Sequence, residues 1–154
     1  MDRDPELFWY FEQSEASDYG GIREPRGSYN TDLAQNDLIA WKNAIELAVV
    51  VYEVTKSWPR AESYGLTSQT RRAAVSVAAN IAEGQGRASK KEFLHFLHIA
   101  QGSLREVETH LVVARRVGLL DDSAFSRATH ACMHSRKPLR GLINHLNEDR
   151  TGGR

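Results

Sequence analysis

The stretch SKKEFLHFLHIAQGSLREVETHLVVARRVG, Ser89 to Gly118, carries the strongest structural signal in the chain. It opens with a capping box, in which Ser89 accepts a hydrogen bond from an N-terminal amide and Glu92 reaches back toward the serine. Its apolar residues then alternate spacings of four and three, which define one face of an α-helix. They are Phe93, Leu97, Ala100, Leu104, Val107, Leu111 and Ala114. Gly118 ends the pattern, so the sequence predicts one long amphipathic helix.

The preceding stretch, LTSQTRRAAVSVAANIAEGQGR from Leu66 to Arg87, predicts a helix built from small residues. Thr67 or Ser68 is expected as the N-cap, and Gly84 as the residue after the C-terminus. The inward stripe is predicted to hold Ala74, Val77 or Ala78, and Ile81. Small side chains let helix axes approach closely, so this helix is expected to sit tightly between larger ones.

A helix from Asp37 to Pro59 shows two apolar stripes side by side. The first stripe contains Leu38, Trp41, Ile45, Ala48, Tyr52 and Thr55, and the second contains Ala44, Leu47, Val51, Val54 and Trp58. Such a wide apolar face exceeds what one neighbouring helix covers, so we predict a central helix or one buried between subunits. The residues predicted to form the oligomer interface are Leu47, Val51, Val54 and Trp58.

The last helix starts near Asp121 or Asp122 and again repeats apolar residues on one face. They are Phe125, Ala128, Cys132, Ser135, Leu139, Leu142 and Leu146. Pro138 falls inside this run and is expected to kink or split the helix.

Four helices with short connections predict an all-α fold, an antiparallel up-down-up-down four-helix bundle over residues 37–147. Residues 1–36 are predicted to form a largely irregular N-terminal tail, and residues 148–154 a flexible C-terminus. The aromatic run LFWYFEQ, residues 7–13, is expected to dock either on a partner or on its own domain.

The formal net charge of zero conceals an asymmetry. Residues 1–36 hold three basic side chains against eight acidic ones, a net charge of −5, which leaves +5 for the remainder because the whole chain balances 20 against 20. An acidic tail on a basic body indicates nucleic-acid binding, self-inhibition by the tail, or a solubilising tail. A single cysteine, Cys132, favours a reducing, cytoplasmic setting, and no apolar run is long enough to cross a membrane.

Antiparallel packing should gather basic residues at one end of the bundle, which we call the basic pole. It consists of Lys56, Arg60, Arg71, Arg72, Arg115, Arg116 and Arg127. Four acidic residues accompany them, which leaves a net charge of +3: Glu53, Glu62, Asp121 and Asp122. We predict that the pole contacts phosphates, with Arg71 and Arg72 at its centre. Alternatively, one of these two pairs with Glu108 or Glu53 and holds the helices in register.

Catalytic and metal motifs are incomplete in this sequence. Glu92-x-x-His95 has the spacing of a di-iron carboxylate motif, but that site needs a second such motif and two further glutamates. His130 and His134, one helical turn apart, could hold a metal, yet the sequence places no carboxylate or cysteine to complete a tetrahedron. We therefore expect no enzymatic activity, no catalytic residues, no cofactor and no metal.

Three segments together resemble a known protein family. They are DLIAWKNAIELAVVVYEVTKSWP, ESYGLTSQTRRAAVSVAANIAEG and KEFLHFLHIAQGSLREVETHL, within a match from about Asp37 to about Asn147. The chain resembles the four-helix-bundle proteins encoded in intervening sequences of large-subunit ribosomal RNA genes, a family that includes the accessory variability determinant of diversity-generating retroelements. Two features depart from the family pattern: the tail that precedes Asp37, and Pro138 in the last helix.

The resemblance implies a homopentameric barrel and a non-enzymatic role. Retroelement members are partners of a reverse transcriptase and bind nucleic acid through a basic surface, whereas ribosomal-insert members have no settled role. The function expected for this chain is therefore an oligomeric accessory protein that binds RNA or DNA, with a reverse transcriptase as its implied partner. The alternative is a structural or protein-interaction module that assembles into a ring without binding nucleic acid.

Overall fold

The computed structural model describes residues 31–148, with side chains from Ile39 onward. The predictions for the aromatic run at residues 7–13 and for the C-terminus beyond residue 148 lie outside the described residues. Over residues 31–148 the chain is all-α, without a strand. Its elements are α2 (Thr31–Val54), the 3₁₀ helix η2 (Arg60–Glu62), α3 (Leu66–Gln85), α4 (Lys90–Arg116) and α5 (Asp122–Glu148).

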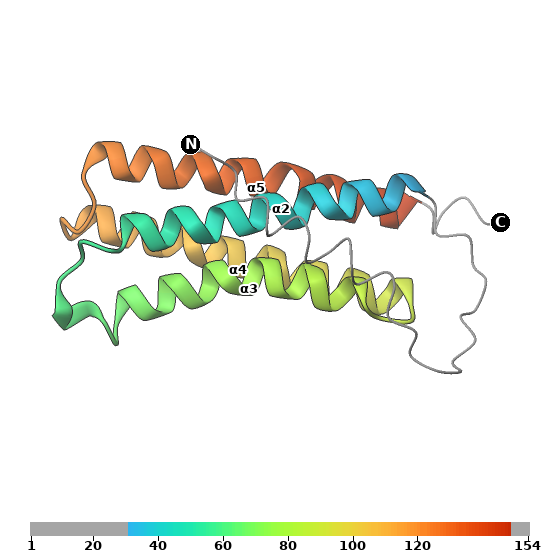
Figure 1. Ribbon diagram of the computed structural model, residues 1–154, viewed down its shortest axis with the longest axis horizontal. Helices are drawn as coiled ribbons and strands as arrows, with labels where there is room; N and C mark the ends of the chain where they lie inside the picture. The colour runs from blue at the N-terminus through green and yellow to red at the C-terminus, as the bar shows by residue number, and fades with distance from the viewer. Residues whose placement is uncertain (1–30, 149–154) are drawn as a thin grey trace, which may run out of the picture.

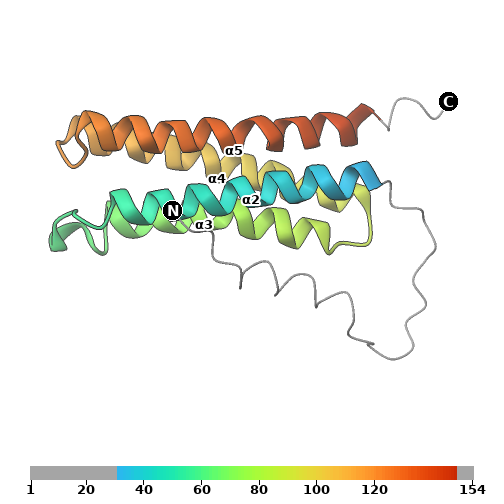
Figure 2. The same cartoon turned by 45° about the horizontal axis from the view of Figure 1, so that its top comes forward.

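The four α-helices form a bundle in which each helix packs on its two sequence or spatial neighbours. α2 packs on α3 and α5, and α4 packs on the same two helices, whereas within the described residues the backbones of the diagonal pairs lie farther apart. Figures 1 and 2 show the helices running side by side, with successive helices joined at alternate ends. The predicted antiparallel up-down-up-down bundle is confirmed.

The N-terminal boundary of the bundle differs from the prediction. α2 begins at Thr31 rather than at Asp37, so residues 31–36, which we assigned to the irregular tail, are helical. At its other end α2 stops at Val54, and the backbone amide of Thr55 donates a hydrogen bond to the carbonyl of Val51 at 3.1 Å. The helix therefore lies earlier in the chain than its apolar pattern indicated.

The core of the bundle follows the predicted stripes of α3, α4 and α5 closely. In α4, Leu94 is buried and Phe93 is only half-buried, a shift of one position at the start of the stripe. In α5 the stripe from Ala128 to Leu146 is buried as expected, and Phe125 packs at its margin. Apolar burial of this kind, at roughly 25 cal/mol per Å², is the main contribution to folding free energy.

The stripe of α2 that we assigned to an oligomer interface lies in the core of the bundle instead. The predicted oligomer contacts are all buried in the core of the single chain: Leu47, Val51, Val54 and Trp58. They cannot form a surface for a second copy, which corrects the predicted interface. The other stripe keeps exposed apolar surface, since Tyr52 is 48% exposed and Trp41 and Ile45 are half-buried. Periodicity reveals both stripes, but only the positions of α3 and α5 decide which one faces the bundle axis.

Local capping matches the prediction at α4 and differs at α3. The Glu92 amide donates to Ser89 Oγ at 3.2 Å, and the serine hydroxyl donates to the Glu92 carboxylate at 2.8 Å. At α3 the N-cap is Gly65, not Thr67 or Ser68, and the Leu66 amide donates to Glu62 Oε2 at 3.2 Å. The η2 turn brings this carboxylate to the helix N-terminus, where negative charge is favourable.

Gly84 lies inside α3 rather than beyond its end, because the helix continues to Gln85 with Gly86 as its C-cap. A Cβ on Gly84 would lie 2.8 Å from side-chain atoms of both Phe93 and Phe96. The missing side chain therefore lets α3 approach the first turns of α4, which is the close packing that small residues indicated.

α5 passes through Pro138 without a break, so the proline does not split the helix as we considered. Proline has no amide hydrogen, which leaves the carbonyl of the residue four positions earlier, His134, without its usual helical donor. Asn43 of α2 supplies one, and its side-chain amide donates to the His134 carbonyl at 3.0 Å.

Candidate nucleic-acid interface

The basic pole lies at the end of the bundle that carries the α2–α3 and α4–α5 connections, at the left in Figure 1. Three contacts join the helix ends there. Arg71 of α3 bonds Thr55 after α2, Arg127 of α5 pairs with Glu53 of α2 at 3.2 Å, and Arg115 of α4 pairs with Asp122 of α5. Residues far apart in the sequence thus meet at one end, as antiparallel packing predicted.

Arg71 is half-buried and holds two helices together. Its Nε donates to Thr55 Oγ1 at 2.8 Å, and its guanidinium carbon lies 4.7 Å from the centre of the Tyr52 ring, a cation–π geometry. The alternative that one arginine fixes the register of the helices therefore describes Arg71, but through a hydroxyl and an aromatic ring. Neither of the predicted partners is used.

Glu53 and Glu108, the two carboxylates predicted to pair with Arg71 or Arg72, have other partners. Glu53 pairs with Arg127, and Glu108 pairs with Arg136. The other acidic groups of the pole are also committed. Asp122 pairs with Arg115, Glu62 caps α3, and Asp121 caps α5 by accepting from the Ala124 amide at 2.7 Å. Two of the four acidic residues thus serve helix termini and two neutralise an arginine each.

Four cations of the basic pole remain exposed and, among the side chains of residues 39–148, form no ion pair: Lys56, Arg60, Arg72 and Arg116. Exposed side chains with unengaged guanidinium or ammonium donors are those that contact phosphates most readily. Arg71 and Arg72, which we predicted to form the centre of the basic pole, therefore have different roles. Arg72 points to solvent with these cations, whereas Arg71 supports the fold.

A second group of basic residues lies on α5 and was missed as a group by the sequence analysis. Arg136, Lys137 and Arg140 line a shallow surface cavity of about 460 Å³ together with Met133, Gly141 and Asn144. The run RKPLR, residues 136–140, carried this signal, because Arg140 lies four residues after Arg136 and three after Lys137, and residues three or four apart on a helix share a face. Arg136 is paired with Glu108, which reduces the net field of this group.

At the opposite end of the bundle, an ion pair offsets the positive charge of Arg87. Arg87 pairs with Glu83 one turn earlier and lies over the Phe96 ring, with 4.7 Å from its guanidinium carbon to the ring centre. Asn80 has a structural role there, because its side-chain amide donates to the Ser76 carbonyl at 2.7 Å and to the Ser76 hydroxyl at 2.9 Å.

The lone cysteine is a core residue. Cys132 is 1% exposed, and burial raises the pKa of its thiol from 9.0 to about 12, with the nearby Glu108 carboxylate adding to the shift and Arg136 opposing it. A thiol of this kind is protonated at neutral pH and is a poor nucleophile. Across the described part of the chain, no three histidine, cysteine, aspartate or glutamate side chains cluster as metal ligands would.

None of the described helices combines the length and the apolar character that crossing a bilayer requires.

Residues 36–141 match the model of the family described as 23S rRNA-intervening sequence protein. The chain belongs to this family. The matched residues span most of the bundle, from α2 to Gly141 in α5, and the match confirms the resemblance to the proteins of ribosomal RNA intervening sequences. The family's link to retroelement accessory proteins stays a prediction for this chain.

A solved structure shares the fold of this family member. It is a protein of unknown function from the S23 ribosomal protein family of Bacteroides thetaiotaomicron, with a TM-score of 0.65 and 22% sequence identity. The alignment covers 71% of this chain and 98% of the other. At this identity the similarity establishes the shared bundle and no more. No curated protein shows a significant match to the chain.

Proposed function

We propose that this protein is a non-enzymatic accessory protein that binds nucleic acid, with structured RNA as the first candidate, through its basic pole. The observation that carries the proposal is the division of charges at that pole. Every acidic side chain there has a local partner, whereas Lys56, Arg60, Arg72 and Arg116 keep their cationic groups in solvent. Phosphates are the ligands that such an uncompensated group of cations attracts most strongly.

The bundle supports this role by holding the cations on separate but fixed elements. Lys56 follows α2, Arg60 lies in η2, Arg72 is in the second turn of α3, and Arg116 ends α4. Contacts such as Arg71 to Thr55 fix these helix ends relative to one another. Fixed cations lose less conformational entropy on binding than cations on a flexible tail, and they can recognise the shape of a nucleic-acid backbone.

A more specific form of this proposal includes a protein partner and an assembly state. A reverse transcriptase is the partner that the resemblance to retroelement accessory proteins implies, and a pentamer is the implied assembly. A reverse-transcriptase gene with template and variable repeats beside the gene for this chain would support that form. A gene neighbourhood confined to a ribosomal RNA operon would contradict it and leave the nucleic-acid role standing.

The proposal is tested by measuring RNA binding at two salt concentrations. We expect the purified full chain to bind a structured RNA in a fluorescence-anisotropy assay, and a salt increase from 50 to 200 mM to weaken binding by about 10-fold or more. The double variant Arg72→Ala/Arg116→Ala should bind more weakly at every salt concentration. It should also reduce the magnitude of the slope of log affinity against log salt by about one to two units. Each phosphate contact that the variant cannot make is one fewer site from which binding releases counterions.

Arg105→Ala is the matched control, because Arg105 is an exposed arginine in the middle of α4, away from both ends of the bundle. It removes one charge without touching the pole, so its salt slope should equal that of the unaltered chain. Binding that is absent at 50 mM salt, or equal losses in Arg105→Ala and in each single pole variant, would refute the proposal.

A specific surface favours self-association as a second function. α2 and α3 present exposed apolar side chains on their shared outer face, with Val49 47%, Tyr52 48% and Val75 46% exposed. Arg71 lies over Tyr52, which places these two helix faces side by side. Contiguous apolar surface on a small protein is typical of protein–protein contact. We propose this α2/α3 face, in place of the buried stripe of α2, as the surface that joins copies of the chain.

Light scattering tests the second proposal. The unaltered chain should be oligomeric at micromolar concentration, and Val49→Glu/Val75→Glu should be a folded monomer, because two carboxylates would be buried without partners at the interface. Val113→Glu is the matched control on α4, where Val113 is 42% exposed, and should leave the assembly unchanged. A monomeric unaltered chain would exclude assembly through this face.

A further inference from the structure

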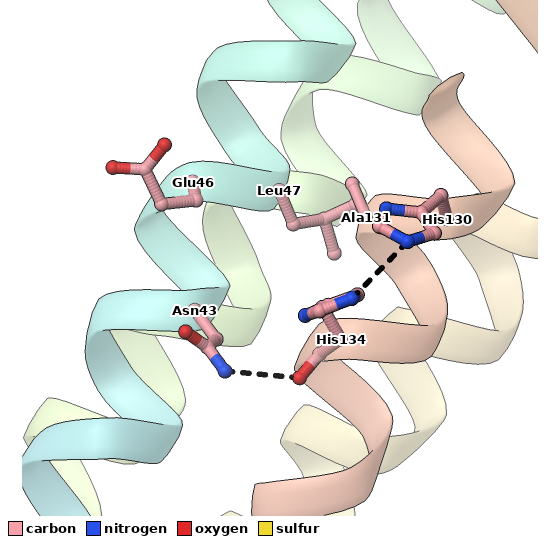
Figure 3. Close-up of a pocket in the computed structure, with 6 residues that line it drawn as sticks. All are labelled: Asn43, Glu46, Leu47, His130, Ala131 and His134. Atoms are coloured by element: carbon pink, nitrogen blue, oxygen red, sulfur yellow. Dashed lines mark hydrogen bonds between the residues drawn. The ribbon is translucent and has the colours of Figure 1, made fainter.

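Two histidines of α5 lie together in a cleft between α5 and α2. His130 and His134 are one turn apart, both are exposed, and a hydrogen bond of 3.2 Å joins their Nε2 atoms. The ring centres are separated by 4.3 Å. The histidines line a cavity of about 230 Å³ with Ala131 and with Asn43, Glu46 and Leu47 of α2. Figure 3 shows both rings in this space and the Glu46 carboxylate directed away from them.

The distance between the two nitrogens matches that of two ligands on one metal ion. Zinc–imidazole bonds of ~2.0–2.1 Å at a tetrahedral angle place two nitrogens about 3.3–3.4 Å apart, and a right angle, as in octahedral sites, places them about 2.9 Å apart. The observed 3.2 Å lies between these values. A cation that replaces the proton shared by the two Nε2 atoms could therefore be bound by both with little change in their positions.

The backbone beneath the pair is fixed by the neighbouring helix. Asn43 donates to the His134 carbonyl at 3.0 Å, so α2 holds α5 at the residue that carries one of the two imidazoles. A ligand pair held in place before the ion arrives loses less entropy on binding. The sequence shows only that the two histidines are four residues apart. The hydrogen bond from Asn43, like the nitrogen distance and the cavity, is visible only in the structure.

The charges around the cavity are compatible with a cation. Glu46 of α2 is acidic and lines the same space. On α5, Arg127 lies one turn before His130 and is already paired with Glu53, and Lys137 lies one turn after His134 and is exposed. Glu46 thus adds one negative charge at the edge of the cavity, whereas the nearest cations along α5 are paired or in solvent.

We propose that His130 and His134 form a binding site for a divalent transition-metal cation of the class that prefers imidazole, with Zn²⁺ as the probe. Two imidazole nitrogens occupy two coordination positions and water occupies the others. Glu46 stays outside the coordination sphere and contributes only its charge. This site is independent of the basic pole, so the two proposals fail or succeed separately.

Isothermal titration of the full, metal-stripped chain with Zn²⁺ at pH 7.5 tests the proposal. We expect one ion per chain, and a loss of affinity of at least about 10-fold in both His130→Ala and His134→Ala, because each removes one of two ligands. His98→Ala replaces an exposed histidine of α4, is the matched control and should bind as the unaltered chain does. Glu46→Gln should change the affinity by less than about threefold, as expected for an exposed charge.

The pH dependence provides a second readout. Protons compete with a metal ion for the imidazole nitrogens, so Zn²⁺ binding should be weaker at pH 5.5 than at pH 7.5. Circular dichroism of each variant checks that the helices are intact. The proposal is overturned by an absence of binding up to 1 mM Zn²⁺, by binding that persists in both histidine variants, or by a loss in Glu46→Gln equal to that in the histidine variants.

Discussion

Asn43 of α2 completes the hydrogen bonding of α5 at the carbonyl of His134, which Pro138 leaves without a helical donor. A single tertiary hydrogen bond thus compensates for a residue that ordinarily interrupts a helix. It also links the two helices at mid-length, next to the cavity that His130 and His134 line. α5 therefore depends on α2 for part of its backbone hydrogen bonding.

Removing the asparagine should destabilise the bundle by about 1 kcal/mol, the net contribution of one hydrogen bond. In Pro138→Ala the residue 138 amide can bond the His134 carbonyl itself. The cost of Asn43→Ala should then fall by half or more. Urea denaturation of the two single variants and the double variant measures this coupling. Additive effects would show that Asn43 does not serve the carbonyl that the proline leaves free.

Gly84→Ala should destabilise the protein by about 1–2 kcal/mol. The new Cβ would lie 2.8 Å from side-chain atoms of Phe93 and Phe96, and overpacking outweighs the gain of up to about 1 kcal/mol in helix propensity. Gly102→Ala is the matched control, because a Cβ there has no neighbour within 4 Å, and it should stabilise the protein by about 0.5–1 kcal/mol. Thermal melts followed by circular dichroism compare the two, and equal shifts in both variants would contradict the close approach of α3 and α4.

Arg71→Ala and Arg72→Ala should separate stability from binding. Arg71→Ala loses the hydrogen bond to Thr55 and the stacking on Tyr52, so we expect a loss of about 1–2 kcal/mol in the free energy of unfolding. Arg72 is exposed, and its replacement should change stability by less than about 0.5 kcal/mol while it weakens RNA binding. Chemical denaturation and anisotropy on the same samples provide both values, and a reversed order of stabilities would disprove the division between the two arginines.

Cys132 should be inert toward thiol reagents in the folded protein. Burial raises the pKa of the thiol to about 12, so it stays protonated at pH 8 and reacts only when the bundle opens. The unfolded chain ionises this group near pH 9.0, and ionisation there favours unfolding. The thiol's contribution to stability is therefore complete below about pH 9 and declines as pH rises toward 12. Labelling with a chromogenic disulfide reagent, with and without urea, measures this, and rapid labelling of the native protein would contradict it.

The helix content and much of the core were readable from the sequence for a simple reason. A helix that buries one face must repeat apolar residues every three or four positions, and the stripes of α4 and α5 do so over seven turns with strong caps such as Ser89 and Asp121. The short connections then leave antiparallel neighbours as the natural arrangement. The start of α2 was missed because residues 31–36 carry no such apolar repeat.

The sequence by itself determined four amphipathic helices and their order along the chain. It also determined which helix ends carry the basic residues of the pole. Tertiary packing alone decided which stripe of α2 is core, that Arg71 supports the fold while Arg72 faces solvent, and that His130 and His134 share a cavity with α2. The physical reason is that periodicity fixes the direction of side chains relative to their own helix axis. It does not fix how that axis is rotated against its neighbours, and this rotation decides what each side chain contacts.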